Sequence, residues 1–292
     1  GGEVARREFR WGGNAFTNSV LTVFQPNTDT KMDYFDKAET WDRATLETVQ
    51  LARLKTTIQQ ASRAPFYAKR LAEAGVSADN LRSLEDIRRI PFTSKDDLRS
   101  QYPYGLATVP HSEFVRMHCS SGTTGTPVAV CYTQPDINSW ADLMARCLYM
   151  AGVRKDDVFQ NMSGYGLFTG GLGIHFGAER LGCMTIPAGA GNSKRQLKLV
   201  KDFGTTVAHI LPSYALHLGT TLIEEGEDPK ALSLRIACVG AEPYTEETRR
   251  RIEALFDMKV YNSYGLSEMN GPGVAFECQY QNGLHLWEDA YL

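Results

Sequence analysis

Apolar residues in the first part of the chain recur at the spacing of a helix. One stripe between Trp41 and Ser62 consists of Leu46, Val49, Leu54 and Ile58. Residues three or four apart share one face of an α-helix, so this stretch is predicted to be helical. Pro65 can open a second helix and Gly75 can end it. The residues before these helices have weak periodicity, and we predict an irregular amino-terminal arm over residues 1–33.

Two serines further along have the spacing of helix starts. Ser83 and Ser94 each stand three residues before a carboxylate, Asp86 and Asp97. A hydroxyl and a carboxylate at this spacing can cap the first backbone N–H groups of a helix reciprocally. The first part of the chain is therefore expected to be helical and peripheral.

From residue 114 onward, short apolar runs alternate with amphipathic stretches. Strands are predicted at 114–119, 128–132, 158–162, 183–186, 206–210, 234–239, 259–262 and 284–287. Helices are predicted at 136–150, 171–181, 193–203, 214–225 and 245–256. This alternation is typical of an α/β fold with a largely parallel, doubly wound sheet and helices on both faces. We expect one large domain over residues 34–292.

Composition narrows the class of protein. The 292 residues carry a formal net charge of -3, and Lys and Arg are scattered, which argues against a nucleic-acid partner. There is no run of about eighteen apolar residues and no charged-then-apolar amino terminus, so neither a membrane span nor a secretory signal is expected. The six cysteines are widely spaced, as in reduced thiols of a cytoplasmic protein.

The segment Ser120-Ser-Gly-Thr-Thr-Gly-Thr-Pro127 is suited to binding anions. Its glycines allow close approach of the backbone, and its hydroxyls and amides can surround phosphate oxygens. It lacks the lysine of a Walker loop and joins two predicted strands. Composition alone does not separate this interpretation from an ordinary polar hairpin loop.

A second unusual segment runs from Tyr261 to Val274. After a strand it places an aromatic ring, a glycine, a hydroxyl and one carboxylate in a tight turn, so that Tyr264 could stack on a purine and Glu268 could hold a divalent cation. Gly240-Ala-Glu-Pro243 follows the preceding predicted strand, and ligands of such sheets bind at the strands' carboxyl ends. The two loops should lie side by side, each offering one carboxylate. Two ordinary strand-to-helix loops with solvated glutamates are the alternative.

These segments, in this order, resemble the phenylacetate–coenzyme A ligase branch of the adenylate-forming acyl-CoA synthetases. The segments Ile90–Thr93, Gly164–Gly171, Pro212–Tyr214 and Leu284–Asp289 fit the same branch, and the resemblance runs from about Tyr34 to the last residue. It implies two-step activation of a small carboxylic acid, with phenylacetate as the best guess. The carboxylate attacks the α-phosphorus of Mg-ATP to give an acyl-adenylate and pyrophosphate, and the thiol of coenzyme A then displaces AMP.

The resemblance also implies roles for particular residues. Thr124 and Glu268 would be catalytic, with Glu268 holding Mg²⁺. Nucleotide-binding residues would be Ser120, Ser121, Gly122, Thr123, Thr124, Gly125, Gly240, Ala241, Glu242, Pro243, Asn262, Ser263, Tyr264, Gly265 and Ser267. The acyl pocket would contain Tyr165, Phe168, Gly170 and Gly171, because glycines let a flat ring lie against backbone while aromatic side chains stack on it. A glycine-rich helix start packed in the core is the alternative for any one of the last four.

The chain departs from the family pattern in two ways. Many relatives carry a lysine where Thr126 stands, so this loop contributes no cation. In relatives, the ribose-binding aspartate, an arginine and a mobile carboxy-terminal domain with a catalytic lysine lie beyond the position of Leu292. The chain is therefore interpreted as truncated and is expected to be inactive alone. Adenylation with transfer to a carrier protein, or a non-catalytic nucleotide-binding module, remain alternatives. The oligomeric state is open, with a homodimer as the hypothesis.

Cys278 and His285 flank Asn282-Gly283, a dipeptide typical of a hairpin turn. A thiolate and an imidazole suit Zn²⁺, but a structural site needs four ligands. The resemblance suggests that a later Cys-Pro-Cys segment could supply the other two; a buried cysteine and a strand histidine are the alternative. The other histidines considered, His175, His209 and His217, lack ligand spacing and are expected to be packing or surface residues.

Overall fold

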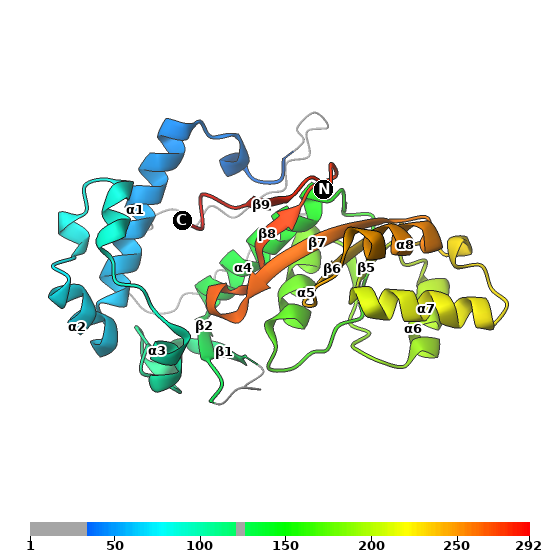
Figure 1. Cartoon of the computed structure of the whole chain (residues 1–292), viewed down its shortest axis with the longest axis horizontal. Helices are drawn as coiled ribbons and strands as arrows, with labels where there is room; N and C mark the ends of the chain where they lie inside the picture. Colours follow the sequence, from blue (N-terminus) through cyan, green and yellow to red (C-terminus); the bar gives the residue numbers. More distant parts are fainter. Residues whose placement is uncertain (1–33, 121–125) are drawn as a thin grey trace, which may run out of the picture. The chain divides into compact units, whose positions relative to one another are not determined.

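A computed structural model describes residues 34–120 and 126–292, all of which belong to one compact unit (Figure 1). The predicted arm over residues 1–33 and positions 121–125 of the anion-binding segment lie outside the described residues. No helix in the described part of the chain is long and apolar enough to cross a lipid bilayer.

The first described elements are helical, as predicted. They are η1 (Lys37–Thr40), α1 (Arg43–Ala61), α2 (Pro65–Glu73), η2 (Ala78–Asn80), η3 (Leu84–Arg89), α3 (Lys95–Ser100) and η4 (His111–Glu113). The buried stripe of α1 contains Gln50 where Val49 was expected. Both predicted capping boxes are present, but the one at Ser83 opens a 3-10 helix instead of an α-helix. A small apolar cluster holds α1 to the following turns: Leu54, Ile58, Leu71, Val76 and Leu81.

The rest of the chain builds two sheets. β1 (Phe114–Cys119) and β2 (Ala129–Thr133) form an antiparallel pair on either side of the anion-binding segment. The large sheet has the order β4-β3-β5-β6-β7-β8-β9. Its strands are β3 (Val158–Asn161), β4 (Met184–Ile186), β5 (Val207–His209), β6 (Ile236–Gly240), β7 (Lys259–Leu266), β8 (Gly271–Glu277) and β9 (Leu284–Leu286). The five strands from β4 to β7 are parallel, which confirms the predicted fold class.

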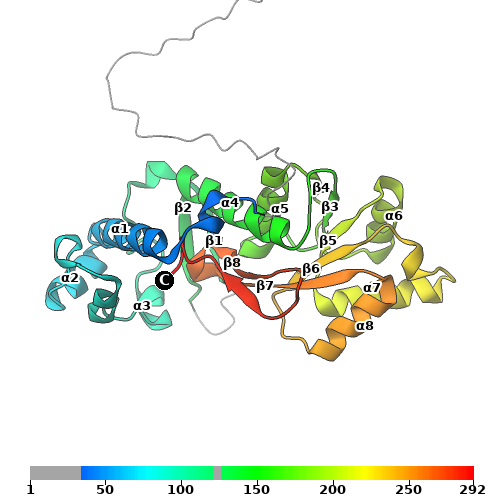
Figure 2. The same ribbon diagram turned by 90° about the horizontal axis from the view of Figure 1, so that it is seen from above.

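Helices cover both faces of this sheet. They are α4 (Gln134–Met150), α5 (Thr169–Leu181), α6 (Ser193–Phe203), α7 (Pro212–Glu224) and α8 (Glu246–Phe256), with the short η5 (Pro229–Ala231) after α7. Figure 2 shows α4 and α5 on one face and α7 and α8 on the other. α6 joins α7 and α8, because Leu197 and Val200 share a buried cluster with Ala208 of β5 and Ala237 of β6. Alternate strand residues point to opposite faces, so each of these strands contributes to both cores.

The chain reverses its winding direction between β3 and β5. From β3 it crosses to β4 on one side, and it then returns to β5 on the other side of β3. Asn161 and His209 are partners in register at the carboxyl ends of these two strands. In doubly wound sheets, ligands bind in the crevice outside the strand ends at such a switch point. The topology therefore locates the candidate site before any side chain is considered.

The predicted strand ending at Asn262 is longer than the sequence indicated. β7 continues to Leu266 and pairs with β8 in antiparallel orientation, so the turn between them consists only of η6 (Ser267–Met269) and Asn270. β8 begins within the segment from Tyr261 to Val274 that is predicted to form a tight turn, and it continues to Glu277. Its glycines and proline obscure the strand pattern, and its extended backbone is stabilised by hydrogen bonds to β7, which a local pattern does not reveal.

Candidate active site

A cavity of about 850 Å³ opens at the switch point of the sheet. This volume is within the range of small-molecule sites. Four of the segments that line it lie at or after the carboxyl end of a parallel strand: 162–170 after β3, His209 and Leu211 at β5, 240–244 at β6, and 262–266 at the end of β7. Ala190 and Pro272 complete the lining. Most of the predicted site residues that the structure describes meet here: Tyr165, Phe168, Gly170, Gly240, Ala241, Glu242, Pro243, Asn262, Ser263, Tyr264 and Gly265.

The wall formed by 240–244 and 262–266 is called the nucleotide wall below. Gly240 and Ser263 are partners in register, and a Cβ atom at Gly240 would lie 2.6 Å from the carbonyl oxygen of Ser263. Glycine is therefore needed for the two loops to approach each other. Ala241 has a φ of 66°, a left-handed conformation that costs free energy in a residue with a Cβ atom. Such strain is found mainly at binding sites. Tyr264 borders the cavity and is 52% exposed, so its ring is available to a ligand.

The two glutamates of the motifs have different surroundings. The carboxylate of Glu242 accepts hydrogen bonds from the backbone N–H of Ser213, at 2.6 Å, and from its hydroxyl, at 3.0 Å. It is thereby held at the first turn of α7, where a negative charge is favourable. Glu268 does not line the main cavity. It borders a second cavity of about 340 Å³, and its carboxylate lies 3.7 Å from Nζ of Lys95. The loops are adjacent, as expected, but Glu242 lines the main cavity and Glu268 lines the second one.

The predicted Mg²⁺ ligand is thus a single carboxylate beside a lysine. Mg²⁺ is commonly bound through one or two carboxylates together with substrate phosphates, so one glutamate is compatible with the role. Lys95 also puts a positive charge next to Glu268, although the anion-binding segment has Thr126 in place of a lysine. Ser267, the neighbour of Glu268, is buried at the start of η6.

Of the anion-binding segment, the structure describes Ser120 and residues 126 and 127. The hydroxyl of Ser120 accepts a hydrogen bond from the backbone N–H of Val128 at 2.9 Å, and the Ser120 N–H donates to the Val128 carbonyl at 3.0 Å. Ser120 therefore closes the base of the loop. The predicted phosphate-binding residues Ser121, Gly122, Thr123, Thr124 and Gly125 lie outside the described residues.

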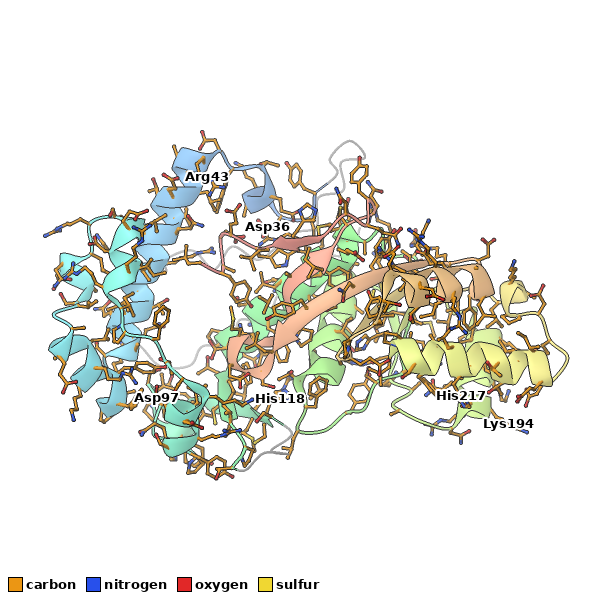
Figure 3. All side chains as sticks on the ribbon, viewed as in Figure 1. Asp36, Arg43, Asp97, His118, Lys194 and His217 are labelled. Carbon is orange, nitrogen blue, oxygen red and sulfur yellow. The ribbon has the colours of Figure 1, made fainter. Side chains whose placement is uncertain are left out.

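The wall formed by 162–170 together with His209 is called the acyl wall below. Its loop is anchored from β1, where the Cys119 N–H donates to the Leu167 carbonyl at 2.9 Å and Nδ1 of His118 lies 3.0 Å from the same oxygen (Figure 3 labels His118). Gly171 does not line the cavity. A Cβ atom there would overlap the Gly164 carbonyl oxygen, so this glycine lets α5 begin directly against the loop.

The aromatic residues of the acyl wall differ in how they are held. The Tyr165 hydroxyl lies 2.9 Å from Nδ2 of Asn161 and 3.0 Å from Nδ1 of His175, and burial raises the pKa of this phenol. Phe168 is 50% exposed, and a Cβ atom at Gly170 would overlap its ring. Both rings border the cavity, as an aryl-binding site requires.

Sequence reasoning missed Asn161 and His209. His209 was expected to be a packing or surface residue, but it borders the cavity with only 8% of its surface exposed. Burial lowers its pKa to about 4, so the ring is neutral near pH 7. A polar residue at the end of an otherwise apolar strand was the available signal. The strand order that makes this strand end a switch point is set by long-range pairing.

Cys278 and His285 lie on the hairpin formed by β8 and β9. His285 is the register partner of Phe276, and Cys278 follows the end of β8. The connection is longer than the expected two-residue turn, since the Gln281 N–H donates to the Cys278 carbonyl at 3.0 Å within it. Across residues 34–120 and 126–292, no group of three or more His, Cys, Asp or Glu side chains is arranged to hold a metal ion.

Comparison with known proteins supports the assignment suggested by the motifs. The phenylacetate-coenzyme A ligase of Pseudomonas putida is 47% identical over 258 residues, which are 88% of this chain and 59% of that protein. The enzyme of the same name from Thermus thermophilus is 46% identical over 263 residues, 89% of this chain and 59% of that protein. The chain therefore spans about 59% of the length of these curated relatives.

A solved structure agrees with the fold. The crystal structure of 2-hydroxyisobutyryl-CoA ligase in complex with 2-HIB-AMP and CoA superposes with a TM-score of 0.84 at 31% sequence identity, over 91% of this chain and 58% of that one. The family described as "AMP-binding enzyme" matches residues 38–288, which include every loop of the cavity. The chain belongs to the AMP-binding enzyme family and is similar in sequence to its phenylacetate-coenzyme A ligases.

Proposed function

We propose that this chain is the adenylating part of a ligase that joins an aryl-acetate to coenzyme A, with phenylacetate as the best guess. The observation that carries the proposal is a single cavity with two unlike walls. One wall offers the rings of Tyr165 and Phe168, and the other offers Tyr264 and the strained loop at Ala241. An aryl acid and an adenine nucleotide could therefore bind side by side. The names of the Pseudomonas and Thermus relatives support the choice of acid.

In the proposed reaction, the carboxylate oxygen of the acid attacks the α-phosphorus of ATP and pyrophosphate leaves. The thiol of coenzyme A then attacks the acyl carbon, loses its proton and displaces AMP. Mg²⁺, when bound, neutralises phosphate oxygens. The protein aligns the reactants and stabilises developing negative charge. We assign Glu268 to the metal, Thr124 and Ser267 to phosphate oxygens, and Tyr264 to the purine. Residues 34–292 are assigned to the large adenylation domain.

The proposal is tested with the full-length protein. Pyrophosphate release and coenzyme A thioester formation are measured with ATP, Mg²⁺ and one acid at a time: phenylacetate, acetate or hexanoate. We expect phenylacetate to be used best, because aromatic rings line the acyl wall. Equal rates for the aliphatic acids would remove the aromatic pocket from the proposal. Pyrophosphate release without thioester would indicate another acceptor, such as a carrier protein. No pyrophosphate release with any acid would overturn the adenylation step.

We also propose that Cys278 and His285 bind zinc together with two ligands from outside the described residues. The support is their place on one hairpin and the softness of the thiolate. Metal analysis of the full-length protein should find about one zinc per chain, and Cys278→Ser should lower both zinc content and thermal stability. The control is Cys131→Ser, which replaces a half-buried cysteine on β2 and should leave the zinc content unchanged. A stable, metal-free protein would refute this site.

We further propose that the enzyme is a cytoplasmic homodimer. Light scattering coupled to size-exclusion chromatography tests its assembly, and cell fractionation tests its location. A monomer, or a protein found outside the cytoplasmic fraction, would overturn the corresponding part.

A further inference from the structure

The acyl wall contains a continuous chain of hydrogen-bonding side chains at the switch point. Nδ1 of His209 lies 3.0 Å from Oδ1 of Asn161 and 3.1 Å from Oγ of Ser163. Nδ2 of Asn161 lies 2.9 Å from the Tyr165 hydroxyl, which lies 3.0 Å from Nδ1 of His175. Ser163, Tyr165 and His209 all border the cavity. The proton positions along this chain determine what the wall can bind.

Two backbone groups fix the orientation of the Asn161 amide. The Ser163 N–H donates to Oδ1 at 3.1 Å, and Nδ2 donates to the Gly171 carbonyl at 2.7 Å. A backbone N–H can only donate and a carbonyl can only accept, so the amide oxygen and nitrogen cannot be exchanged. The atom of Asn161 that faces His209 is therefore an acceptor, and Nδ1 of His209 must carry a hydrogen.

The ring of His209 consequently presents a bare nitrogen. Burial keeps the imidazole neutral, and its single N–H is at Nδ1, so Nε2 has a lone pair and no hydrogen. No hydrogen-bond partner of Nε2 is found among the described residues, and Nε2 is not one of their fully buried unpartnered atoms, so it is accessible from the cavity. A ligand that covers this acceptor without supplying a donor would leave it buried and unpaired, which is unfavourable.

Tyr165 and His175, the further members of this hydrogen-bonded chain, do not compete for this role. The Tyr165 hydroxyl accepts from Asn161 and therefore donates to Nδ1 of His175. The remaining ring nitrogen of His175 then donates to Glu179, whose carboxylate oxygen lies 3.1 Å away. Each of these atoms has its partner within the protein. Among the side-chain nitrogens of this hydrogen-bonded chain, Nε2 of His209 is the one without a protein partner and is available to a ligand in the cavity.

We propose that the acid bound here carries a hydroxyl group on its aromatic ring and that this hydroxyl donates a hydrogen bond to Nε2 of His209. The inference rests on the proposed function and narrows its substrate class from aryl-acetates to hydroxylated aryl-acetates. His209 ends β5, directly beside β3, whose following loop carries Tyr165 and Phe168. The acyl part of the ligand is therefore the part within reach. A site with a committed acceptor disfavours the analogue that lacks the donor.

The first experiment compares acids that differ only in this donor. In the full-length protein, kcat/KM for pyrophosphate release is measured with the three hydroxyphenylacetate isomers, their methyl ethers and phenylacetate. At least one hydroxy isomer should exceed phenylacetate by roughly tenfold, the scale of one satisfied buried acceptor. Its methyl ether should show no advantage, because an ether cannot donate. If no hydroxy isomer exceeds phenylacetate, the inference is wrong while the proposed function stands.

Binding without reaction separates the two proposals. Calorimetric titration of the same acids, with ATP omitted, should show the same preference for the hydroxy isomer even if no acid supports pyrophosphate release. That outcome would refute the proposed function but support the binding site for the ring hydroxyl. Equal dissociation constants for the hydroxy isomers and phenylacetate would remove the site.

Substitution tests the residue itself. His209→Phe keeps a ring but removes the acceptor, so the ratio of kcat/KM for the hydroxy isomer over phenylacetate should fall to about one. His217→Phe is the matched control, since His217 is an exposed histidine of α7 outside the cavity, and it should keep the wild-type ratio (Figure 3 labels His217). An unchanged ratio in His209→Phe would refute the contact.

Nitrogen NMR gives a readout that does not depend on the variant folding. In the wild-type protein, His209 should carry its hydrogen on Nδ1, and the Nε2 resonance should shift when the preferred hydroxy isomer is added. Phenylacetate should leave that resonance nearly unchanged. A hydrogen found on Nε2 in the free protein would overturn the inference.

Discussion

The acyl wall and the nucleotide wall border one cavity, but they are held in different ways. Next to the acyl wall, Asn161 at the end of β3 is fully buried and joins two residues of that wall, Tyr165 and His209, through hydrogen bonds of 2.9–3.0 Å. On the nucleotide wall, Tyr264 is half exposed. Just beyond this wall, Glu268 borders the second cavity, and its ion-pair partner among the described residues is Lys95, whose side chain is 55% exposed.

The difference indicates which partner completes each wall. A wall whose polar groups, apart from Nε2 of His209, already satisfy one another is preorganised and can discriminate between similar acids, because rearranging it would break buried hydrogen bonds. A wall with exposed groups obtains its remaining contacts from the ligand. The nucleotide brings phosphates and a metal ion that can provide those contacts.

Replacing Glu268 should have the largest effect. In the full-length protein, Glu268→Gln should reduce adenylate formation by roughly a hundredfold or more, because the metal that neutralises the phosphates loses its carboxylate. Pyrophosphate exchange measures this step. Glu242→Gln is the matched control, since Glu242 is held by Ser213 and should cost much less activity. Exchange that survived nearly intact in Glu268→Gln would disprove the metal role.

Lowering the pH should destabilise the folded protein through protonation of His209. Its folded pKa of about 4 lies below the ordinary value near 6.5, so the folded state resists protonation. Its contribution to stability is fully present above about pH 6.5 and is lost as the pH falls toward 4, a change of about 3 kcal/mol at 1.36 kcal/mol per pH unit. Urea unfolding at several pH values between 7 and 4.5 measures the slope of the free energy of unfolding against pH.

The variant His209→Gln should have a shallower slope over this range, even though it is less stable at pH 7. Burial also lowers the pKa of His118, which acts in the same direction, so the slope should not vanish. His217→Gln, at an exposed position, should keep the wild-type slope. Identical slopes for His209→Gln and the wild type would mean that His209 is not buried as a neutral group.

Removing the ring at Tyr264 should weaken nucleotide binding without affecting the fold. Tyr264→Ala should raise the dissociation constant for ATP about tenfold or more, since stacking on a base contributes about 1–3 kcal/mol. Thermal unfolding should be nearly unchanged because the side chain is 52% exposed. Tyr264→Phe keeps the ring and should bind ATP like the wild type. A large loss of stability in Tyr264→Ala would contradict the view of an open nucleotide wall.

The smallest effect is expected at the Tyr165 hydroxyl. Tyr165→Phe keeps the ring but removes the partner of Asn161 and His175, so the free energy of unfolding should fall by about 1 kcal/mol. Tyr264→Phe removes an exposed hydroxyl with no hydrogen bond to the described residues and should cost close to nothing. Chemical denaturation of both variants compares the two walls directly. Equal losses of unfolding free energy in Tyr165→Phe and Tyr264→Phe would contradict the proposed difference between the acyl wall and the nucleotide wall.

Many secondary-structure elements of this protein can be predicted from the local sequence pattern. α6 was predicted with the same bounds that it has, Ser193–Phe203, because a polar cap, an apolar stripe and a terminal glycine all lie within a few residues of one another. The loops at Gly240 and Tyr264 were expected side by side for a similar reason: each follows an apolar run of a parallel strand. Their close approach at Ser263 is confirmed.

The alternation of strands and helices, the family and the order of the binding segments could all be predicted from the sequence, since each depends on neighbouring residues. Long-range strand pairing, in contrast, places β5 on the other side of β3, so that Asn161 and His209, distant in sequence, share a hydrogen bond at the switch point. Contacts between distant segments also give Glu242 and Glu268 different partners. The reason is physical: strand order, burial and the pKa of an imidazole depend on contacts between distant segments, and a local pattern does not contain them.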